Sequence, residues 1–135
     1  MPDIQPRATI VIVEDTPDIR EVVELILAES GYDVISLPNG ERCLETVQDC
    51  RPDLVLMDLS LPRIDGWEAT RRLKADDATS NIPVLAFTAH AQDRALNDAR
   101  QAGCSAVITK PFEIDDLLRT ITEAIHDMPV RPAAA

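Results

Sequence analysis

The sequence predicts a doubly wound α/β fold, in which five parallel strands alternate with five helices in a single domain. The chain has 135 residues, which is the length of one ordinary domain. Short runs of β-branched and leucine residues recur along it, and each is followed by a segment with the apolar period of a helix. Strands that alternate with helices form parallel sheets, because each crossover returns the chain to the same edge.

The composition indicates a globular and acidic protein. Hydrophobic residues make up 45% of the chain, which disfavours intrinsic disorder. Thirteen basic residues against 24 acidic ones give a net charge of −11, which disfavours binding to nucleic acid or to an anionic membrane surface and suits a protein that binds cations. No apolar run approaches the ~20 residues of a membrane span, and residues 1–8 lack the apolar core of a secretion signal.

The three cysteines are Cys43, Cys50 and Cys104. Their odd number and the absence of a CxxC spacing argue against a disulfide framework and against a zinc site. We therefore expect buried or half-buried thiols in a reducing compartment, and a cytoplasmic protein.

The first strand and helix follow from local patterns. The β-branched run Thr9–Val13 predicts a central strand. Pro17 suits the first turn of a helix, Gly31 suits the left-handed position that ends it, and a second short strand is predicted over 32–37. The apolar stripe of this helix consists of Ile19, Val22, Val23, Ile26 and Leu27.

The apolar run Leu54–Asp58 predicts a strand that is buried on both faces. It follows a helix that starts after residues 39–40. Asp58 stands where this strand gives way to a loop, which Pro62 and Gly66 close. Ligands bind at that edge of an open parallel sheet, so Asp58 is either a structural cap or a reactive group.

The second half of the chain continues the alternation. The predicted elements are a helix over 66–75, a strand over 83–87 that ends at Thr88, a helix over 91–102, a strand over 106–109 and a helix over 113–127. The helix over 91–102 offers little apolar surface beyond alanines, so we expect it to be weakly anchored and mobile. The last helix has a strong apolar stripe, formed by Ile114, Leu117, Leu118, Ile121 and Ile125.

These elements predict a flavodoxin-like doubly wound five-stranded parallel sheet, of strand order 2-1-3-4-5, with helices on both faces. The predicted domain spans 8–127, and we expect 1–7 and 128–135 to be flexible termini. We expect Trp67 to pack in the core or at a helix start. His90 is expected either to shape water access to the strand edge or to be a solvent-exposed loop residue without a role. The charges of Arg71, Arg72 and Lys74 are expected on a solvated helix face.

Five polar residues stand at the carboxyl ends of the predicted strands: Glu14, Asp15, Asp58, Thr88 and Lys110. Because parallel strands end at the same edge, we expect these side chains to meet there. Three carboxylates that close together need a cation, and an oxygen-rich pocket suits Mg²⁺. Lys110 and Thr88 could hold a phosphate oxygen, and Asp58 could accept a phosphoryl group.

Each of these residues also has an ordinary structural interpretation. Glu14 and Asp15 could cap a helix, Thr88 could simply end a strand, and Lys110 could be a surface lysine. Their common register at one edge favours the magnesium and phosphoryl interpretation.

Four short motifs stand at the ends of strands one, three, four and five. They are Glu14-Asp15, Asp58 with Pro62 and Gly66 behind it, Thr88-Ala89, and Lys110-Pro111-Phe112. Together they resemble the receiver domain of two-component response regulators, over about residues 8–125. The resemblance implies that Asp58 receives its phosphoryl group from a phosphohistidine on a sensor histidine kinase or a histidine phosphotransfer protein. It also implies Mg²⁺ bound by Glu14, Asp15, Asp58 and the backbone carbonyl of Ser60, and a cis peptide bond between Lys110 and Pro111.

The sequence departs from the family at one position. Family members usually carry Tyr or Phe three residues before the lysine, and here that residue is Val107. We therefore expect activation to be read out through the loop after Thr88 and the helix over 91–102, without a moving aromatic ring.

No DNA-binding helix pair or catalytic domain is recognisable after Ile125, so we expect a stand-alone response regulator, similar to the chemotaxis regulators, that signals through protein contacts. The resemblance implies that it catalyses only its own phosphorylation and slow dephosphorylation. The first helix is the expected docking face for the histidine-bearing partner. The expected output face combines the helix over 91–102, the strand over 106–109 and the last helix, and a homodimer is left open. The alternative is a receiver fragment of a hybrid histidine kinase or a phosphorelay intermediate.

Other functions on the same kind of sheet fit the sequence less well. An aspartate-nucleophile phosphatase carries a second aspartate two residues after the nucleophile, where this chain has Ser60. A flavin-binding relative would need a phosphate cradle after the first strand, whereas Glu14, Asp15 and Asp18 would repel phosphate. The complete set of site residues disfavours a receiver that no longer takes phosphate.

Overall fold

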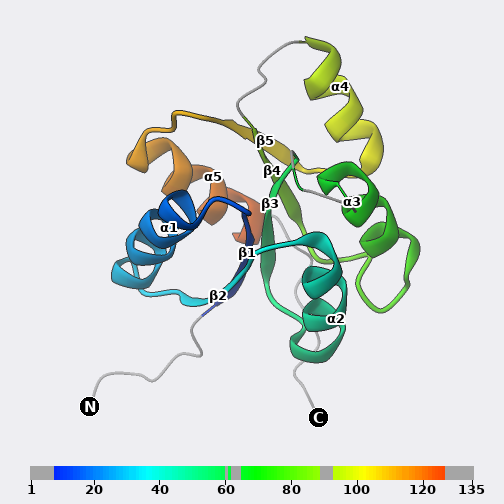
Figure 1. Cartoon of the computed structure of the whole chain (residues 1–135), viewed down its shortest axis with the longest axis horizontal. Coiled ribbons are helices and arrows are strands. Elements are labelled where there is room, and N and C mark those ends of the chain that lie inside the picture. Colours follow the sequence, from blue (N-terminus) through cyan, green and yellow to red (C-terminus); the bar gives the residue numbers. More distant parts are fainter. Residues whose placement is uncertain (1–7, 60, 62–64, 89–92, 127–135) are drawn as a thin grey trace.

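The computed structural model of the chain describes residues 8–59, 61, 65–88 and 93–126, and it contains the predicted sheet (Figure 1). Five parallel strands are hydrogen-bonded in the order β2-β1-β3-β4-β5, which confirms the flavodoxin-like prediction. The strands are β1 (Thr9–Val13), β2 (Asp33–Leu37), β3 (Leu54–Asp58), β4 (Val84–Thr88) and β5 (Ala106–Thr109).

Helices cover both faces of the sheet (Figure 1). The helices α1 (Pro17–Glu29) and α5 (Ile114–His126) lie on one face. The opposite face carries α2 (Gly40–Cys50), α3 (Gly66–Ala75) and α4 (Asp93–Ala102). Each strand is connected to the next strand of the chain through a helix, because parallel strands need a long crossover connection.

The core consists of two apolar layers, one on each side of the sheet. Along β1 the side chains alternate between the layers: Ile10 and Ile12 face α1 and α5, whereas Val11 and Val13 face α2 and α3. The strands β3 and β4 are buried at every position, as the continuous apolar run Leu54–Asp58 predicts.

Two predicted core residues are exposed. Val22 of α1 is 53% exposed, because it lies one residue, or about 100° of helix, from the fully buried Val23. Ile114 is 51% exposed, because it is the first residue of α5 and lies beyond the carboxyl end of β5. The apolar stripes of α1 and α5 are therefore wider in the sequence than the surface that the sheet covers.

Two further predictions are wrong in part: that all three cysteines are buried or half-buried, and that the basic residues of α3 all lie on a solvated face. Cys43 and Cys104 are buried as expected, but Cys50 is exposed because it is the last residue of α2. Arg71 and Arg72 lie on a solvated face and pair weakly with Glu68.

Lys74 does not share the solvated face. It is half-buried, and its Nζ donates hydrogen bonds to the carbonyl oxygens of Ser80 and Ile82, at 3.1 and 2.6 Å. The loop after α3 folds back over this lysine, which the charge pattern alone could not indicate.

Several expectations concern segments outside the described residues. They are the flexible termini at 1–7 and 128–135, His90, and the loop directly after Thr88. The domain limits 8–127 and the mobility of α4 stay predictions. Among the helices of the described part, none is both long and apolar enough to cross a membrane.

Candidate functional site

The carboxyl edge of the sheet brings four of the predicted side chains together. Glu14 directly follows β1, Asp58 ends β3, Thr88 ends β4, and Lys110 directly follows β5. The strands β1 and β3 are neighbours, although chain connectivity runs from β1 to β2, so this is the topological switch point at which open α/β sheets bind ligands.

Three carboxylates face one another at this edge. Glu14, Asp15 and Asp58 each offer an oxygen, and these oxygens lie within 4.8 Å of one another. Glu14 and Asp58 are 1% and 2% exposed, whereas Asp15 is open to solvent. The predicted acidic cluster is therefore present, with two buried members and one at the mouth.

The position of Asp58 depends on a close approach of the chain at Gly66. The Gly66 N–H donates to the Leu59 carbonyl oxygen at 3.3 Å. A Cβ at Gly66 would meet the Asp58 carbonyl oxygen and would lie 2.6 Å from the Leu59 Cα. Glycine is thus required where α3 begins against the end of β3, which explains why Gly66 closes this loop.

Lys110 bridges the two buried acids. Its Nζ lies 2.6 Å from Glu14 Oε1 and 3.5 Å from Asp58 Oδ2. The backbone N–H of Lys110 donates to the Thr88 carbonyl oxygen at 2.8 Å, which holds β5 against β4 at this point. The peptide bond between Lys110 and Pro111 is cis, as the resemblance implies.

Sequence reasoning missed Phe87 as a neighbour of the site. The Lys110 ammonium lies 4.7 Å from the centroid of the Phe87 ring, a cation–π distance. Phe112 packs on the same ring, with a centroid separation of 5.4 Å. Phe87 pairs in register with Asp58 of β3, and this neighbourhood appears only once the two strands are paired.

The pKa of the Glu14 carboxyl is raised in the folded protein. Burial raises the pKa of the Glu14 carboxyl to about 7, and the nearby Asp58 adds to the rise, whereas Lys110 opposes it. In the absence of a further cation, Glu14 is therefore partly protonated near neutral pH. A second positive charge, in addition to that of Lys110, would stabilise the ionised carboxylates of this site.

The donor set fits Mg²⁺. All the side-chain ligands on offer are carboxylate oxygens, which are the hard ligands that this ion prefers, and few of them are needed because the ion keeps several waters. Because Asp15 is exposed, the acidic cluster is open to solvent on that side. Ser60, whose carbonyl the resemblance adds to the ligands, lies outside the described residues.

Thr88 is buried at the end of β4 and pairs in register with Thr109 of β5. Val107, the departure from the family pattern, is half-buried and packs against the core layer of α2 and α3. Its side chain therefore fills space inside the fold, on the sheet face that carries α4.

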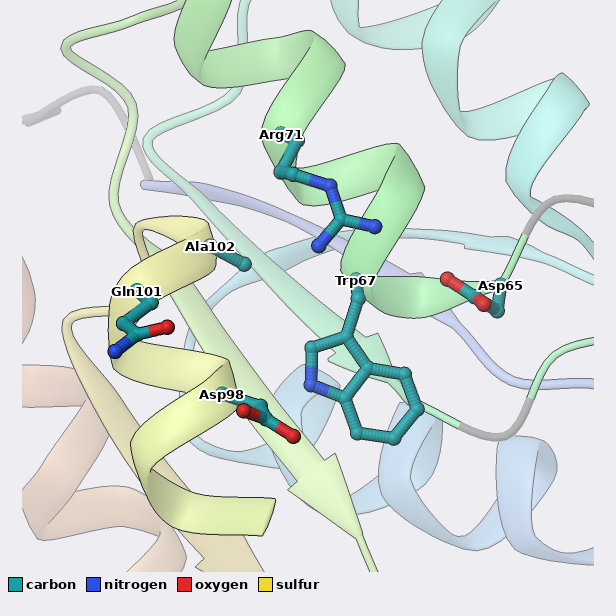
Figure 2. A pocket seen from close by; sticks show the side chains of 6 residues that line it. All are labelled: Asp65, Trp67, Arg71, Asp98, Gln101 and Ala102. Atoms are coloured by element: carbon teal, nitrogen blue, oxygen red, sulfur yellow. The ribbon is translucent and has the colours of Figure 1, made fainter. Parts of the chain in front are cut away.

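Trp67 packs at the start of α3, as predicted. It contacts the core layer on that face and borders a hollow of about 450 Å³ between α3 and α4. Figure 2 shows its indole directed from α3 toward α4, with Asp98 and Gln101 across from it. Among the described residues, Trp67 Nε1 is a buried donor without a hydrogen-bond partner.

These features define a class of protein: a doubly wound α/β domain with an acidic, lysine-bridged pocket at its topological switch point. The model of the response regulator receiver domain matches residues 10–122. The chain belongs to this family.

Comparison with known proteins supports the assignment at the level of sequence and of structure. The polar-differentiation response regulator DivK of Brucella anthropi is 38% identical over 119 residues, which are 88% of this chain and 97% of that protein. A response regulator structure from Chloroflexus aurantiacus is 30% identical, has a TM-score of 0.87, and covers 90% of this chain and 99% of its own.

A third relative is the receiver domain of a sensor histidine kinase from Pseudomonas aeruginosa. It is 32% identical with a TM-score of 0.85, and it covers 90% of this chain and all of its own. That structure holds a magnesium ion coordinated in its active-site cleft.

Proposed function

We propose that this receiver domain accepts a phosphoryl group on Asp58, with Mg²⁺, from a phosphohistidine of a sensor histidine kinase or a histidine phosphotransfer protein. The observation that carries the proposal is the contact set of Lys110, whose Nζ reaches both Glu14 and Asp58 beside the acidic cluster. Phosphoryl transfer requires mostly positioning and neutralisation of charge, and these groups supply both.

The proposed reaction is a displacement at phosphorus. A carboxylate oxygen of Asp58 forms a bond to phosphorus, the bond from phosphorus to the donor's imidazole nitrogen breaks, and the nitrogen keeps the electron pair. Lys110 then exchanges its contact with Asp58 for one with a phosphoryl oxygen. The Thr88 hydroxyl, at the end of the adjacent strand, donates a hydrogen bond to another of these oxygens.

Glu14, Asp15, Asp58 and the backbone carbonyl of Ser60 would hold the magnesium ion. When bound, the ion would neutralise the carboxylates and the incoming phosphoryl oxygens. Lys110 and these acids would therefore act by positioning groups and by neutralising charge. The chain would promote its own phosphorylation and would not act on a separate substrate.

We propose that the histidine-bearing partner docks on α1 and the start of α5. Val22 and Leu25 of α1 are exposed apolar residues, and so is Ile114 of α5. A hollow of about 520 Å³ between Ile19 and Phe112 also reaches Lys110. An apolar surface that leads to the phosphoacceptor suits a helix that presents a phosphohistidine.

The proposed output surface is formed by α4, β5 and α5, and signalling from it would be through protein contacts. β5 is an edge strand, and a hollow of about 400 Å³ lies along it, between Val107 and Arg119. A homodimer and a cytoplasmic location stay predictions.

A stand-alone regulator and a part of a larger kinase are both represented among the relatives. The match to DivK spans nearly all of that regulator, which favours the stand-alone form. The similarity to the receiver domain of a sensor histidine kinase favours the second candidate, a receiver within a hybrid kinase or phosphorelay. Both candidates share the chemistry at Asp58.

The proposal is tested by incubation with acetyl phosphate, with and without MgCl₂, followed by phosphate-affinity gel electrophoresis. We expect a shifted, Mg²⁺-dependent band that is lost in Asp58→Asn and kept in Asp77→Asn, because Asp77 is an exposed acid of the loop after α3. A band that persists in Asp58→Asn, or that forms equally in EDTA, would contradict the proposal.

A further inference from the structure

Arg20 makes the contact on which the inference rests. It is the fourth residue of α1, and its Nη1 donates a 2.8 Å hydrogen bond to the backbone carbonyl oxygen of Glu14. A cation in the first turns of a helix is placed against the positive end of the helix dipole, which is unfavourable for the helix itself. The helix itself therefore does not explain an arginine at this position, and the reason must lie in its contacts outside α1.

The bonded carbonyl belongs to the peptide unit that joins Glu14 to Asp15. On the other side of Glu14, its N–H donates to the Leu37 carbonyl oxygen of β2 at 3.0 Å. The main chain of Glu14 is thus held from β2 on one side and from α1 on the other. Rotation of the following peptide plane would have to break the bond to Arg20.

That peptide plane positions the backbone from which the Asp15 side chain extends. Glu14 also has side-chain contacts of its own, with Lys110 Nζ and with the Thr16 N–H at 3.3 Å. Asp15 is exposed at the mouth, and the hydrogen bonds of the described residues include none from its side chain. The direction of Asp15 therefore depends on the backbone that Arg20 holds.

The guanidinium of Arg20 contacts the main chain of Glu14 rather than its carboxylate. The two carboxylate oxygens have other partners, since Oε1 is bound by Lys110 Nζ and Oε2 accepts from the Thr16 N–H.

We propose that Arg20 is a positioning residue that orients the Glu14–Asp15 peptide, so that both carboxylates face the same cation. This inference rests on the proposed function, because it concerns the Mg²⁺ site. Arg20 lies outside the motif Glu14-Asp15. In this inference it helps to build the site but does not itself contact the ion.

The test compares Arg20→Met with Arg72→Met. Methionine keeps an unbranched side chain of high helix propensity and removes the donor. Arg72 is an exposed arginine of α3 whose ion pair with Glu68 spans 4.0 Å, so its replacement serves as the matched control. Mg²⁺ alone is titrated while backbone amide NMR shifts are followed, and thermal unfolding is recorded in EDTA and in MgCl₂.

We expect the Kd for Mg²⁺ to rise roughly three- to tenfold in Arg20→Met and to stay within about twofold in Arg72→Met, since a single hydrogen bond of this kind is lost. The rise in Tm on adding Mg²⁺ should shrink in Arg20→Met, because weaker binding stabilises less. A purely structural arginine would instead lower Tm equally with and without the ion.

A second measurement does not need the ion. In EDTA, the Glu14 amide should exchange its hydrogen faster in Arg20→Met than in the wild type, because one of the two main-chain bonds of Glu14 is gone. Arg20→Gln is the second variant, and the Glu14 amide should exchange faster in it than in the wild type as well. A Kd within about twofold of the wild type in Arg20→Met, or unchanged exchange at Glu14, would overturn the inference.

The two hypotheses fail differently. If the wild-type protein shows no Mg²⁺-dependent amide shifts, the proposed function itself is wrong. If the wild type binds Mg²⁺ and Arg20→Met binds it equally well, the role of Arg20 is wrong and the proposed function stands.

Discussion

At the residue scale, Lys110 is a single cation that contacts two buried acids. Lys110 Nζ contacts Glu14 Oε1 at 2.6 Å and Asp58 Oδ2 at 3.5 Å, and both acids are almost completely buried. Burial is the main cause that raises the pKa of Glu14, and the nearby Asp58 adds to the rise because a single lysine cannot neutralise two carboxylates fully. In the proposed function, Lys110 would therefore compete with Mg²⁺ for the same carboxylate oxygens.

We predict that Lys110→Met binds Mg²⁺ at least about threefold more tightly than the wild type, because the competing charge is gone from a poorly solvated site. The same variant should be phosphorylated more slowly by acetyl phosphate, because the phosphoryl oxygens lose their lysine partner. Amide shifts during a Mg²⁺ titration measure the first effect and phosphate-affinity gels the second. Weaker Mg²⁺ binding in Lys110→Met would contradict the competition.

The raised pKa of Glu14 predicts how the metal-free protein responds to pH. The ordinary value is 4.5 and the folded value is about 7, so between these pH values the folded chain binds more protons at Glu14 than the unfolded chain does. The contribution of Glu14 to stability is therefore most favourable below pH 4.5 and declines as pH rises toward 7.

Chemical denaturation in EDTA across this pH window measures the decline. In Glu14→Gln, which has no proton to lose, the part of the decline that belongs to Glu14 should be absent, and the wild-type curve should fall more steeply than the variant curve. Parallel curves would show that the pKa of Glu14 is not raised in the folded protein.

At the element scale, the junction between β3 and α3 places the phosphoacceptor. Gly66 lets α3 begin directly against the backbone of Asp58 and Leu59, and Asp65 caps the helix by accepting from the Glu68 N–H at 2.8 Å. α3 also carries Trp67, whose indole extends toward α4 (Figure 2). The start of α3 is thus held against the end of β3 by tight backbone packing.

We predict that Gly66→Ala lowers the free energy of unfolding by about 1–3 kcal/mol, because its Cβ would overlap backbone atoms that cannot move independently. Gly31→Ala is the matched control. Gly31 has a φ of +96° but no atom within 4 Å of the added Cβ, so only backbone strain opposes that change. Urea denaturation of both variants tests the order: Gly66→Ala should be the more destabilised, and a reversed order would contradict the close approach.

Trp67 offers a separate test of packing between α3 and α4. Its buried Nε1 has no partner among the described residues, so Trp67→Phe removes an unpaired donor and keeps an aromatic ring. We predict a change of less than about 1 kcal/mol in Trp67→Phe and a loss of about 2–4 kcal/mol in Trp67→Ala, where the ring itself is lost. Equal losses in the two variants, measured by urea denaturation, would show that the N–H has a partner.

At the scale of the whole molecule, the sheet order follows from the sequence because its signals are strong and repeated. The continuous run Leu54–Asp58 and the β-branched run Thr9–Val13 are typical of strands buried in a parallel sheet. Once the strands run in the same direction, the position of Glu14, Asp58, Thr88 and Lys110 at one edge needs no further information.

What the sequence could not reveal depends on contacts between distant segments. Val22 has the period of a core residue, and its exposure is decided by where the sheet ends rather than by α1. Lys74 has the composition of a solvated face, but the loop at 76–82 returns to accept its hydrogen bonds. Arg20 lies outside every motif, and its contact with Glu14 appears only when α1 is folded against the end of β1.

The measurement that tests the central claim most directly is the identification of the phosphorylated residue. The protein is treated with acetyl phosphate and MgCl₂, reduced with borohydride, which converts an aspartyl phosphate to homoserine, and mapped by peptide mass spectrometry. The account predicts homoserine at position 58 alone, and none when EDTA replaces MgCl₂. Homoserine at another aspartate, or an unmodified Asp58 in protein that carries phosphate, would contradict it.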